Sequence, residues 1–116
     1  MNQSNEMAKL VYQALDDKKA ADIHMINISE ISVLGDYFII AGGENRNQVQ
    51  AMSDNVSEYL GRAGYECKNV EGYQTADWIL QDYGDVVVHI FNKEARRFYD
   101  LERIWRDGKM VSPEEL

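Results

Sequence analysis

Two acidic residues in the second half of the chain could do chemistry. Asp82 and Asp85 flank the dipeptide Tyr83-Gly84, and two neighbouring carboxylates can bind a cation or serve as a general acid and a general base. Hard cations need several more oxygen ligands than two carboxylates supply. We therefore favour a solvated turn at these positions over a metal site or a catalytic pair.

The other reactive side chains lack the spacing of a metal site or of an activated nucleophile. His24 and His89 lie far apart, and neither has a second histidine three or four residues away. Cys67 is the only cysteine and has no histidine near it in the sequence, so nothing supports a nucleophilic role. We expect no catalytic residue, no metal and no cofactor.

The segment Gly42-Gly43-Glu44-Asn45 lies between an apolar run and a helical pattern, where a phosphate group could sit at a helix N-terminus. It lacks the Lys-Ser or Lys-Thr ending of a P-loop and the G-x-G-x-x-G spacing of a dinucleotide site. An ordinary strand-to-helix turn is the favoured interpretation.

Asp82 and Asp85 lie in a predicted β-hairpin. Residues 77–82 and 85–91 are rich in β-branched and aromatic residues, and Tyr83-Gly84 between them suits a two-residue loop. This loop predicts a register with Asp82 opposite Asp85, Leu80 opposite Val87, and Trp78 opposite His89.

Alternation along the two strands places apolar side chains on both faces of the hairpin. One face has the composition of a core-facing surface, with Ile79, Val86, Val88 and Ile90. The other face carries Trp78, Leu80, Val87, His89 and Phe91, with Asp82 and Asp85 at its rim.

Two interpretations of this second face remain open. Two long predicted helices can cover only one face of a sheet, which would leave the second face for a partner. Alternatively, a C-terminal helical pattern with Phe98, Leu101 and Trp105 folds back over it as ordinary core. We favour a docking surface, and we assign its residues as follows: Trp78, Leu80 and His89 at the apolar centre, Asp82 and Asp85 at the charged rim.

Hydrophobic periodicity predicts the elements that position the hairpin. A helical pattern over residues 7–15, with Ser4 as its cap, precedes a half-buried strand over 22–28 and a central strand over 37–41. Asn45 and Gln48 form a capping pattern for a second helix. Its predicted buried stripe is Val49, Met52, Val56, Leu60 and Ala63, and Gly64 ends it.

This order of elements predicts an α/β fold, with a mixed β-sheet and flanking helices. We expect one domain over residues 1–107 and a frayed C-terminal tail over residues 108–116.

The composition excludes several classes of function. The chain has 116 residues with 12 basic and 20 acidic side chains, a formal charge of -8. It therefore repels polyphosphate unless its basic residues are gathered on one patch, and broad affinity for nucleic acid or anionic membranes is a poor first hypothesis. No segment approaches the roughly 20 apolar residues of a membrane-spanning helix, and the N-terminus does not have the pattern of a signal peptide. These features and the single cysteine favour a cytoplasmic protein that has no direct specificity for nucleic acid.

Five fragments in this order resemble the Iojap-like family of ribosomal silencing factors. They are residues 36–42, Arg46-x-Gln48-Val49-x-Ala51, Glu71-Gly72-Tyr73, residues 78–91, and Tyr99-Asp100-Leu101-Glu102. The likeness spans about residues 5 to 107. Asn45 stands where many members of the family have serine, and asparagine caps a helix equally well.

The resemblance implies an α/β domain similar to nucleotidyltransferases in fold, without a demonstrated transferase activity. It also implies binding to the large ribosomal subunit through its fourteenth large-subunit protein, where the small subunit would dock, so that subunit joining is blocked and translation is repressed. Relatives in organelles take part in large-subunit assembly, and homodimers are common among bacterial members. An acidic domain with an aromatic patch suits a basic ribosomal protein.

Two alternative functions remain. A nucleotidyltransferase needs a glycine-serine loop followed by closely spaced aspartates that hold magnesium. Here no Asp-x-Asp follows residues 42–45, and Asp54 falls within the second predicted helix. The other alternative is a dimeric scaffold for large-subunit assembly, whose aromatic face serves self-association only.

Overall fold

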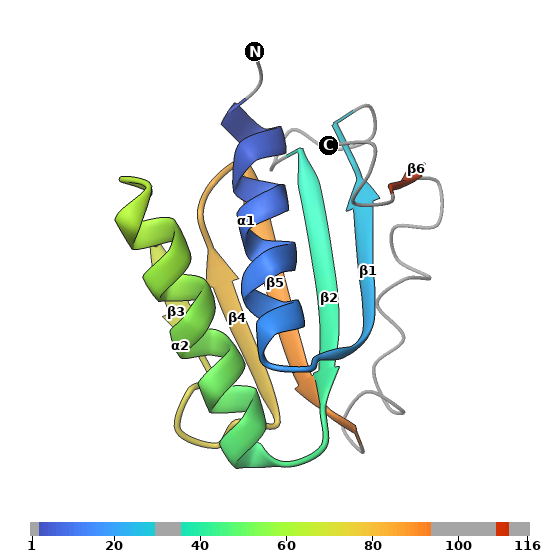
Figure 1. Cartoon of the computed structure of the whole chain (residues 1–116), viewed down its shortest axis with the longest axis vertical. Helices are drawn as coiled ribbons and strands as arrows, with labels where there is room; N and C mark the ends of the chain where they lie inside the picture. Colours follow the sequence, from blue (N-terminus) through green and yellow to red (C-terminus); the bar gives the residue numbers. More distant parts are fainter. Residues whose placement is uncertain (1–2, 30–35, 94–108, 112–116) are drawn as a thin grey trace.

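The computed structural model describes residues 3–29, 36–93 and 109–111, which form two helices and one six-stranded mixed sheet (Figure 1). The elements are α1 Gln3–Asp17, β1 Ala21–Asn27, β2 Tyr37–Gly43, α2 Arg46–Arg62, β3 Asn69–Glu71, β4 Trp78–Asp82, β5 Val86–Asn92 and β6 Lys109–Val111. The predicted class, an α/β fold with a mixed sheet and flanking helices, is confirmed.

The strands lie in the order β3-β4-β5-β2-β1-β6. β2 and β5 pair in parallel, and the other neighbouring strands pair antiparallel. A parallel pair needs a long connection, and here α2, β3 and β4 supply it. β2 is buried along its whole length, which confirms the prediction of a central strand.

The short strand β6 pairs with β1 at one edge of the sheet. The prediction of a frayed tail beyond Gly108 is therefore wrong for residues 109–111. The physical reason is that the outer side of β1 offers backbone N–H and C=O groups that an extended segment can pair with. The predicted C-terminal helical pattern with Phe98, Leu101 and Trp105 lies outside the described residues.

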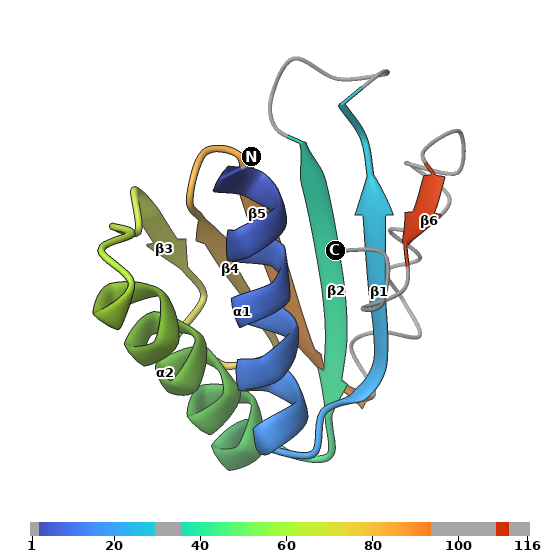
Figure 2. The ribbon, with the colours of Figure 1, turned by 45° about the horizontal axis from the view of Figure 1, so that its top comes forward.

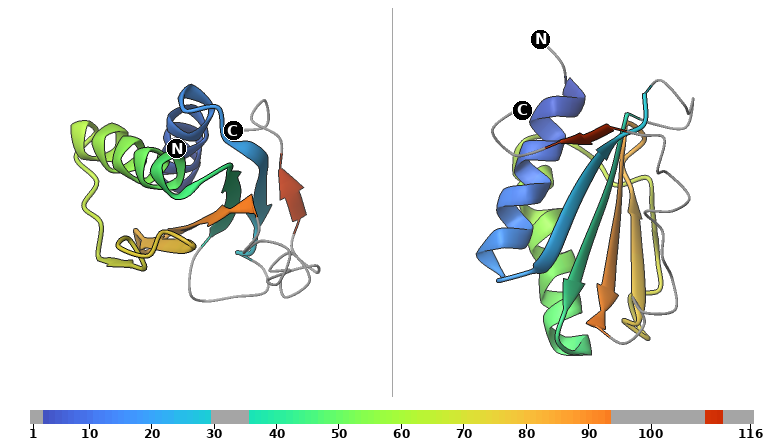
Figure 3. Two further views of the ribbon diagram at one scale, coloured as in Figure 1. Left: turned by 90° about the horizontal axis from the view of Figure 1, so that it is seen from below. Right: turned by 90° about the vertical axis from the view of Figure 1, so that its right-hand side faces the viewer.

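Both helices cover the same face of the sheet (Figures 2 and 3). The helical spacing of apolar residues in α1 places Met7, Val11 and Leu15 on its buried side. Ser4 does not cap this helix as predicted. It lies inside α1, and its hydroxyl donates a hydrogen bond to the carboxylate of Asp36, so it joins α1 to the start of β2.

Asn45 caps α2 as predicted, because its side-chain oxygen accepts a hydrogen bond from the backbone N–H of Gln48 at 2.8 Å. The side chain of Gln48 accepts from the backbone N–H of Glu44 at 2.6 Å, one residue before the position that a reciprocal capping box would use. Gly64 follows the helix with φ +89, also as predicted. Ala63 is exposed rather than buried, because it is the C-cap residue.

The described residues form two hydrophobic clusters on opposite faces of the sheet, as the alternation of side chains requires. The larger one fills the space between the sheet and the helices, and it contains the predicted core-facing residues Ile79, Val86, Val88 and Ile90. The smaller one consists of Ile26, Ile28, Phe38, Ile40 and Phe91, with Trp78 packed against it.

The β4–β5 hairpin confirms the predicted faces but not the predicted register. Leu80 lies opposite His89, and Trp78 lies opposite Phe91 instead of His89. The turn is displaced by one residue from the predicted Tyr83-Gly84, because Tyr83 donates its backbone N–H to the carbonyl oxygen of Val86 at 2.9 Å and thereby leaves Gly84 and Asp85 between the bonded residues. A shift of two residues preserves the alternation of side chains, so the predicted faces survive the change.

Candidate functional site

Three apolar side chains of the hairpin reach the surface on the sheet face that α1 and α2 do not cover. Trp78, Leu80 and Val87 are each half-buried, and we call them the β4–β5 surface. His89 and Phe91 point to the same face but are only 5% and 0% exposed. The prediction that all five residues lie open is therefore wrong for these two, because Phe91 belongs to the smaller hydrophobic cluster and His89 packs against that cluster.

Trp78 and His89 form a cross-strand pair, as predicted. The indole N–H of Trp78 donates a hydrogen bond to Nδ1 of His89 at 2.9 Å, although the two residues are diagonal rather than direct neighbours. The imidazole lies 4.3 Å from the ring of Phe38, and the indole lies 5.2 Å from the ring of Phe91, measured between centroids. Burial lowers the pKa of His89 to about 4, so its imidazole is neutral at pH 7 and Nδ1 can accept.

The loop before β4 fixes the backbone at Trp78. Gly72 has φ +81, and a Cβ atom at this position would lie 2.1 Å from the carbonyl oxygen of Trp78. Ala76 is buried with φ 57, and the hydroxyl of Tyr73 donates to the carboxylate of Asp54 on α2 at 3.0 Å. Sequence reasoning missed this supporting role of the Glu71-Gly72-Tyr73 motif. Only the glycine could have indicated a close approach of the backbone at this position.

The two predicted rim residues have different surroundings. Asp82 continues the alternation of Trp78 and Leu80 along β4, is half-buried, and accepts a hydrogen bond from the backbone N–H of Gly84 at 2.8 Å. Asp85 is exposed at the hairpin turn, at the opposite end of β4 from Trp78. The structure therefore places Asp82 at the edge of the β4–β5 surface and Asp85 beyond it.

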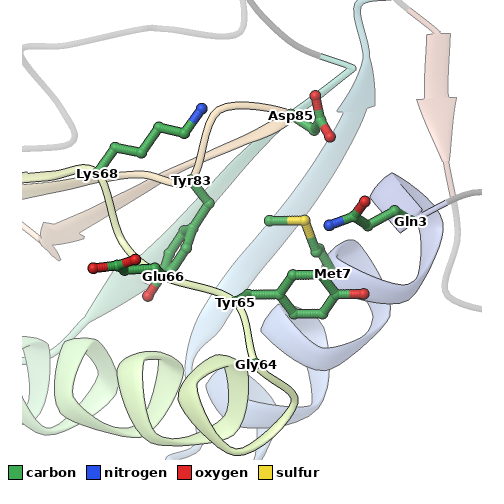
Figure 4. A pocket seen from close by; sticks show the side chains of 8 residues that line it. All are labelled: Gln3, Met7, Gly64, Tyr65, Glu66, Lys68, Tyr83 and Asp85. Atoms are coloured by element: carbon green, nitrogen blue, oxygen red, sulfur yellow. The ribbon is translucent and has the colours of Figure 1, made fainter.

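Asp85 lines a cleft of about 260 Å³ between the start of α1, the α2–β3 connection and the hairpin turn (Figure 4). The side chain of Lys68 lies against Gly84, where a Cβ atom would be 2.7 Å from the ammonium nitrogen. Burial raises the pKa of Tyr83 to about 12, so its phenol stays protonated at pH 7. The cleft is lined by Gln3, Met7, Gly64, Tyr65, Glu66, Lys68, Tyr83 and Asp85.

The glycine segment between β2 and α2 has structural partners. A Cβ atom on Gly43 would lie 2.9 Å from Cγ2 of Val49, so glycine allows α2 to pack closely against β2. The side-chain amide of Gln48 donates to the backbone carbonyl oxygen of Lys18 at 3.0 Å and accepts from Glu44. These contacts tie the start of α2 to the end of α1 and support the interpretation as an ordinary strand-to-helix turn.

Within residues 3–29, 36–93 and 109–111, no group of three or more His, Cys, Asp or Glu side chains is placed to hold a metal ion. In the same part of the chain, neither helix has the length and apolar character needed to cross a membrane. The thiol of Cys67 donates to the backbone carbonyl oxygen of Asn69 at 3.2 Å. The predicted site residues that the structure brings together are thus Trp78, Leu80 and Asp82, with His89 behind them.

The fold and this surface define a small acidic α/β domain that holds a tryptophan on the face of its sheet that α1 and α2 do not cover. The family model described as "Ribosomal silencing factor during starvation" matches residues 1–116. The chain belongs to this family of ribosomal silencing factors, which is named for a regulatory role, and the resemblance found in the sequence is confirmed.

Individual relatives agree with this assignment. The chain is 40% identical over 111 residues to "Ribosomal silencing factor RsfS" of Halalkalibacterium halodurans, covering 96% of this chain and 95% of the relative. A crystal structure of a Chromobacterium violaceum protein superposes with a TM-score of 0.87 at 35% identity, covering 96% of this chain and 92% of that one. A mouse protein named "Mitochondrial assembly of ribosomal large subunit protein 1" is 27% identical over 99 residues, covering 83% of this chain and 43% of the relative.

Proposed function

We propose that this protein binds the large ribosomal subunit through its fourteenth large-subunit protein and prevents the small subunit from joining, so that translation is repressed. The observation that carries this proposal is the half-buried Trp78 on the sheet face that α1 and α2 do not cover, in an acidic domain that belongs to the ribosomal silencing factors. The name of the mouse relative, which refers to assembly of the ribosomal large subunit, supports the choice of subunit.

Charge favours a basic protein as the direct partner. The chain carries a formal charge of -8, which opposes binding to rRNA and attracts a protein rich in lysine and arginine. Asp82 at the edge of the β4–β5 surface and Asp85 at the turn are the proposed partners of those cations. Charged groups at a rim accelerate the encounter, whereas a desolvated aromatic centre determines how long the complex lasts.

Repression by this route needs no chemical step. A protein bound at the surface where the small subunit docks blocks joining by occupying space, and the extent of repression follows the fraction of large subunits that carry it. The proposal assigns no catalytic residue and no cofactor. It places the protein in the cytoplasm, together with the ribosomes on which it acts.

Co-sedimentation with purified ribosomal particles tests the proposal. The wild-type chain should sediment with isolated large subunits, and not with small subunits or with intact ribosomes, in which the docking surface is occupied. Trp78→Ala should weaken binding by about 2 kcal/mol, roughly 30-fold in Kd, with the circular dichroism spectrum unchanged. Val70→Ala, which shortens the 45% exposed side chain on β3, is the matched control and should bind as the wild type does.

Two outcomes would contradict this assignment. Sedimentation with small subunits alone would show that the large subunit is not the particle to which the protein binds. Wild-type affinity of Trp78→Ala for large subunits would remove the β4–β5 surface from the interface.

A homodimer, which the resemblance to bacterial family members implies, needs its own measurement, because a dimer and the ribosome could compete for one surface. Sedimentation velocity of the wild-type chain and of Trp78→Ala, with and without large subunits, separates the arrangements. A Trp78→Ala variant that no longer dimerises but still binds large subunits would favour the dimeric scaffold, whose aromatic face serves self-association. A variant that dimerises but does not bind supports the docking surface.

A further inference from the structure

His89 was predicted as a residue that contacts the partner, but its place in the structure suits a different task. Only 5% of its surface is exposed, so it offers a partner little area. Its Nδ1 instead accepts the hydrogen bond from the indole N–H of Trp78 at 2.9 Å. The contact with the partner would be made by Trp78, and His89 lies directly behind it.

The imidazole itself is held by aromatic rings. Its centroid lies 4.3 Å from the ring of Phe38 on β2 and 6.4 Å from the ring of Phe91, with interplanar angles of 31° and 12°. Phe38 and Phe91 are 5% and 0% exposed. Because these rings are buried in the smaller hydrophobic cluster, the acceptor nitrogen has a fixed position.

The backbone at Trp78 is fixed as well. Gly72 lies against the carbonyl oxygen of Trp78, where a Cβ atom would approach to 2.1 Å. The neighbouring Asp77 accepts a hydrogen bond from the side-chain amide of Asn92 at 2.6 Å, and its carbonyl oxygen accepts from the backbone N–H of Asn92 at 3.1 Å. With the main chain fixed on both sides, the orientation of the indole depends on the side-chain torsions and on the groups that hold the ring.

From this geometry we infer that His89 is a positioning residue, which holds the indole of Trp78 in the orientation that the large subunit recognises. The inference rests on the proposed function. In it, His89 orients the side chain of Trp78 and does not itself contact the large subunit. A tryptophan that is already ordered loses less conformational freedom on binding than a mobile one. Loss of the hydrogen bond should therefore weaken binding three- to tenfold, less than loss of the indole itself.

The experiment compares two substitutions of His89 in a Trp105→Phe background, in which Trp78 is the only indole. His89→Phe keeps a ring of similar shape and removes the acceptor nitrogen. His89→Gln removes the ring and keeps an acceptor, because its side-chain oxygen can receive the indole N–H. His24→Phe, the same substitution at the other histidine, is the matched control.

Two readouts are needed. The indole N–H resonance of Trp78 in ¹⁵N–¹H spectra reports its hydrogen bond in the free protein, through its chemical shift and its rate of exchange with solvent. Binding to isolated large subunits reports the consequence. We expect at least tenfold faster indole exchange and three- to tenfold weaker binding for His89→Phe, partial restoration of both for His89→Gln, and wild-type values for His24→Phe.

The outcomes separate this inference from the proposed function. Wild-type binding by His89→Phe, or an indole resonance that does not respond to the substitution, would overturn the positioning role alone. Failure of the wild-type chain to bind large subunits would overturn the proposed function, and with it the contribution of His89 to subunit recognition. If His89→Phe does not fold, His89→Met, which also lacks a nitrogen acceptor, takes its place with the same expected results.

Discussion

On the helix side of the sheet, β4 and β5 lie in a core that α1 and α2 close, whereas on the other side the same two strands carry the half-buried β4–β5 surface. Even the polar Gln81 is fully enclosed on the helix side, where its amide donates to the carbonyl oxygen and the hydroxyl of Ser53 at 3.0 and 2.7 Å. On the opposite side, the indole of Trp78 donates to His89 of the neighbouring strand. One hairpin thus contributes to stability with one face and offers the other for recognition.

The largest effect should come from cutting a side chain on the helix side. Ile90→Ala removes a fully buried side chain from β5 and should lower the free energy of unfolding by about 3 to 4 kcal/mol. Leu80→Ala on the opposite face removes a half-buried side chain and should cost about 1 kcal/mol. Urea denaturation followed by circular dichroism measures both, and equal losses would show that the two faces are packed alike.

The next effect is a dependence of the free energy of unfolding on pH, and it arises from His89 on the sheet face opposite the helices. Burial lowers the pKa of His89 from 6.5 to about 4, so between these values the unfolded chain binds a proton that the folded chain does not. The free energy of unfolding should therefore fall as the pH drops from about 6.5 to about 4, with a contribution from His89 of about 3 kcal/mol.

Carboxylates also titrate in this range, so the measurement is the difference between the wild type and His89→Gln in urea denaturation at several pH values. The variant has no titrating group at this position and should lose less stability on acidification. Identical pH profiles would mean that His89 is not held neutral by its surroundings.

A smaller effect, of opposite sign, is expected on the outer side of α2. A Cβ atom on Gly61 would meet nothing within 4 Å, so Gly61→Ala should raise the free energy of unfolding by about 0.5 to 1 kcal/mol through the helix propensity of alanine. Gly43→Ala is the contrasting control, because its methyl group would press on Val49. A stabilising Gly43→Ala would show that the helix layer is more loosely packed than its contacts indicate.

The smallest effect should come from the rim. Asp82→Asn keeps an oxygen that can accept the hydrogen bond from Gly84 and removes only the charge. Association with large subunits should slow two- to threefold at low salt, and the difference should vanish at high salt. Asp16→Asn on the exposed side of α1 is the matched control in stopped-flow measurements, and an equal slowing by both variants would assign the effect to net charge alone.

Periodicity and capping predicted most of the fold because they depend on local physics. The buried stripe of α2, the cap at Asn45 and the left-handed residue Gly64 all follow from side-chain types within one helical turn. The predicted hairpin register was wrong because the position of a turn depends on the hydrogen bonds that close it, here the bond from Tyr83 to Val86. β6 was missed because three residues carry no periodic signal of their own, and their strand is defined by pairing with β1.

For the candidate site, the sequence predicted the residue types and the face that they share, but not their burial or their distances from one another. Alternation placed Trp78 and His89 on one face, and both are there. The burial of His89 depends on Phe38, which comes from a strand far away in the sequence, and the separation of Asp82 from Asp85 depends on the turn. Distances across a sheet are set by tertiary pairing, which a single sequence does not contain.

The three residues of β6 also have a protective consequence. They pair with residues 25–27 of β1 along the outer border of the sheet. Deleting the chain from Lys109 onward would expose the amides and carbonyls of that border, which could then recruit an extended segment of another molecule. Shortened versions of this protein should therefore self-associate at high concentration, even if every side chain of the β4–β5 surface is intact.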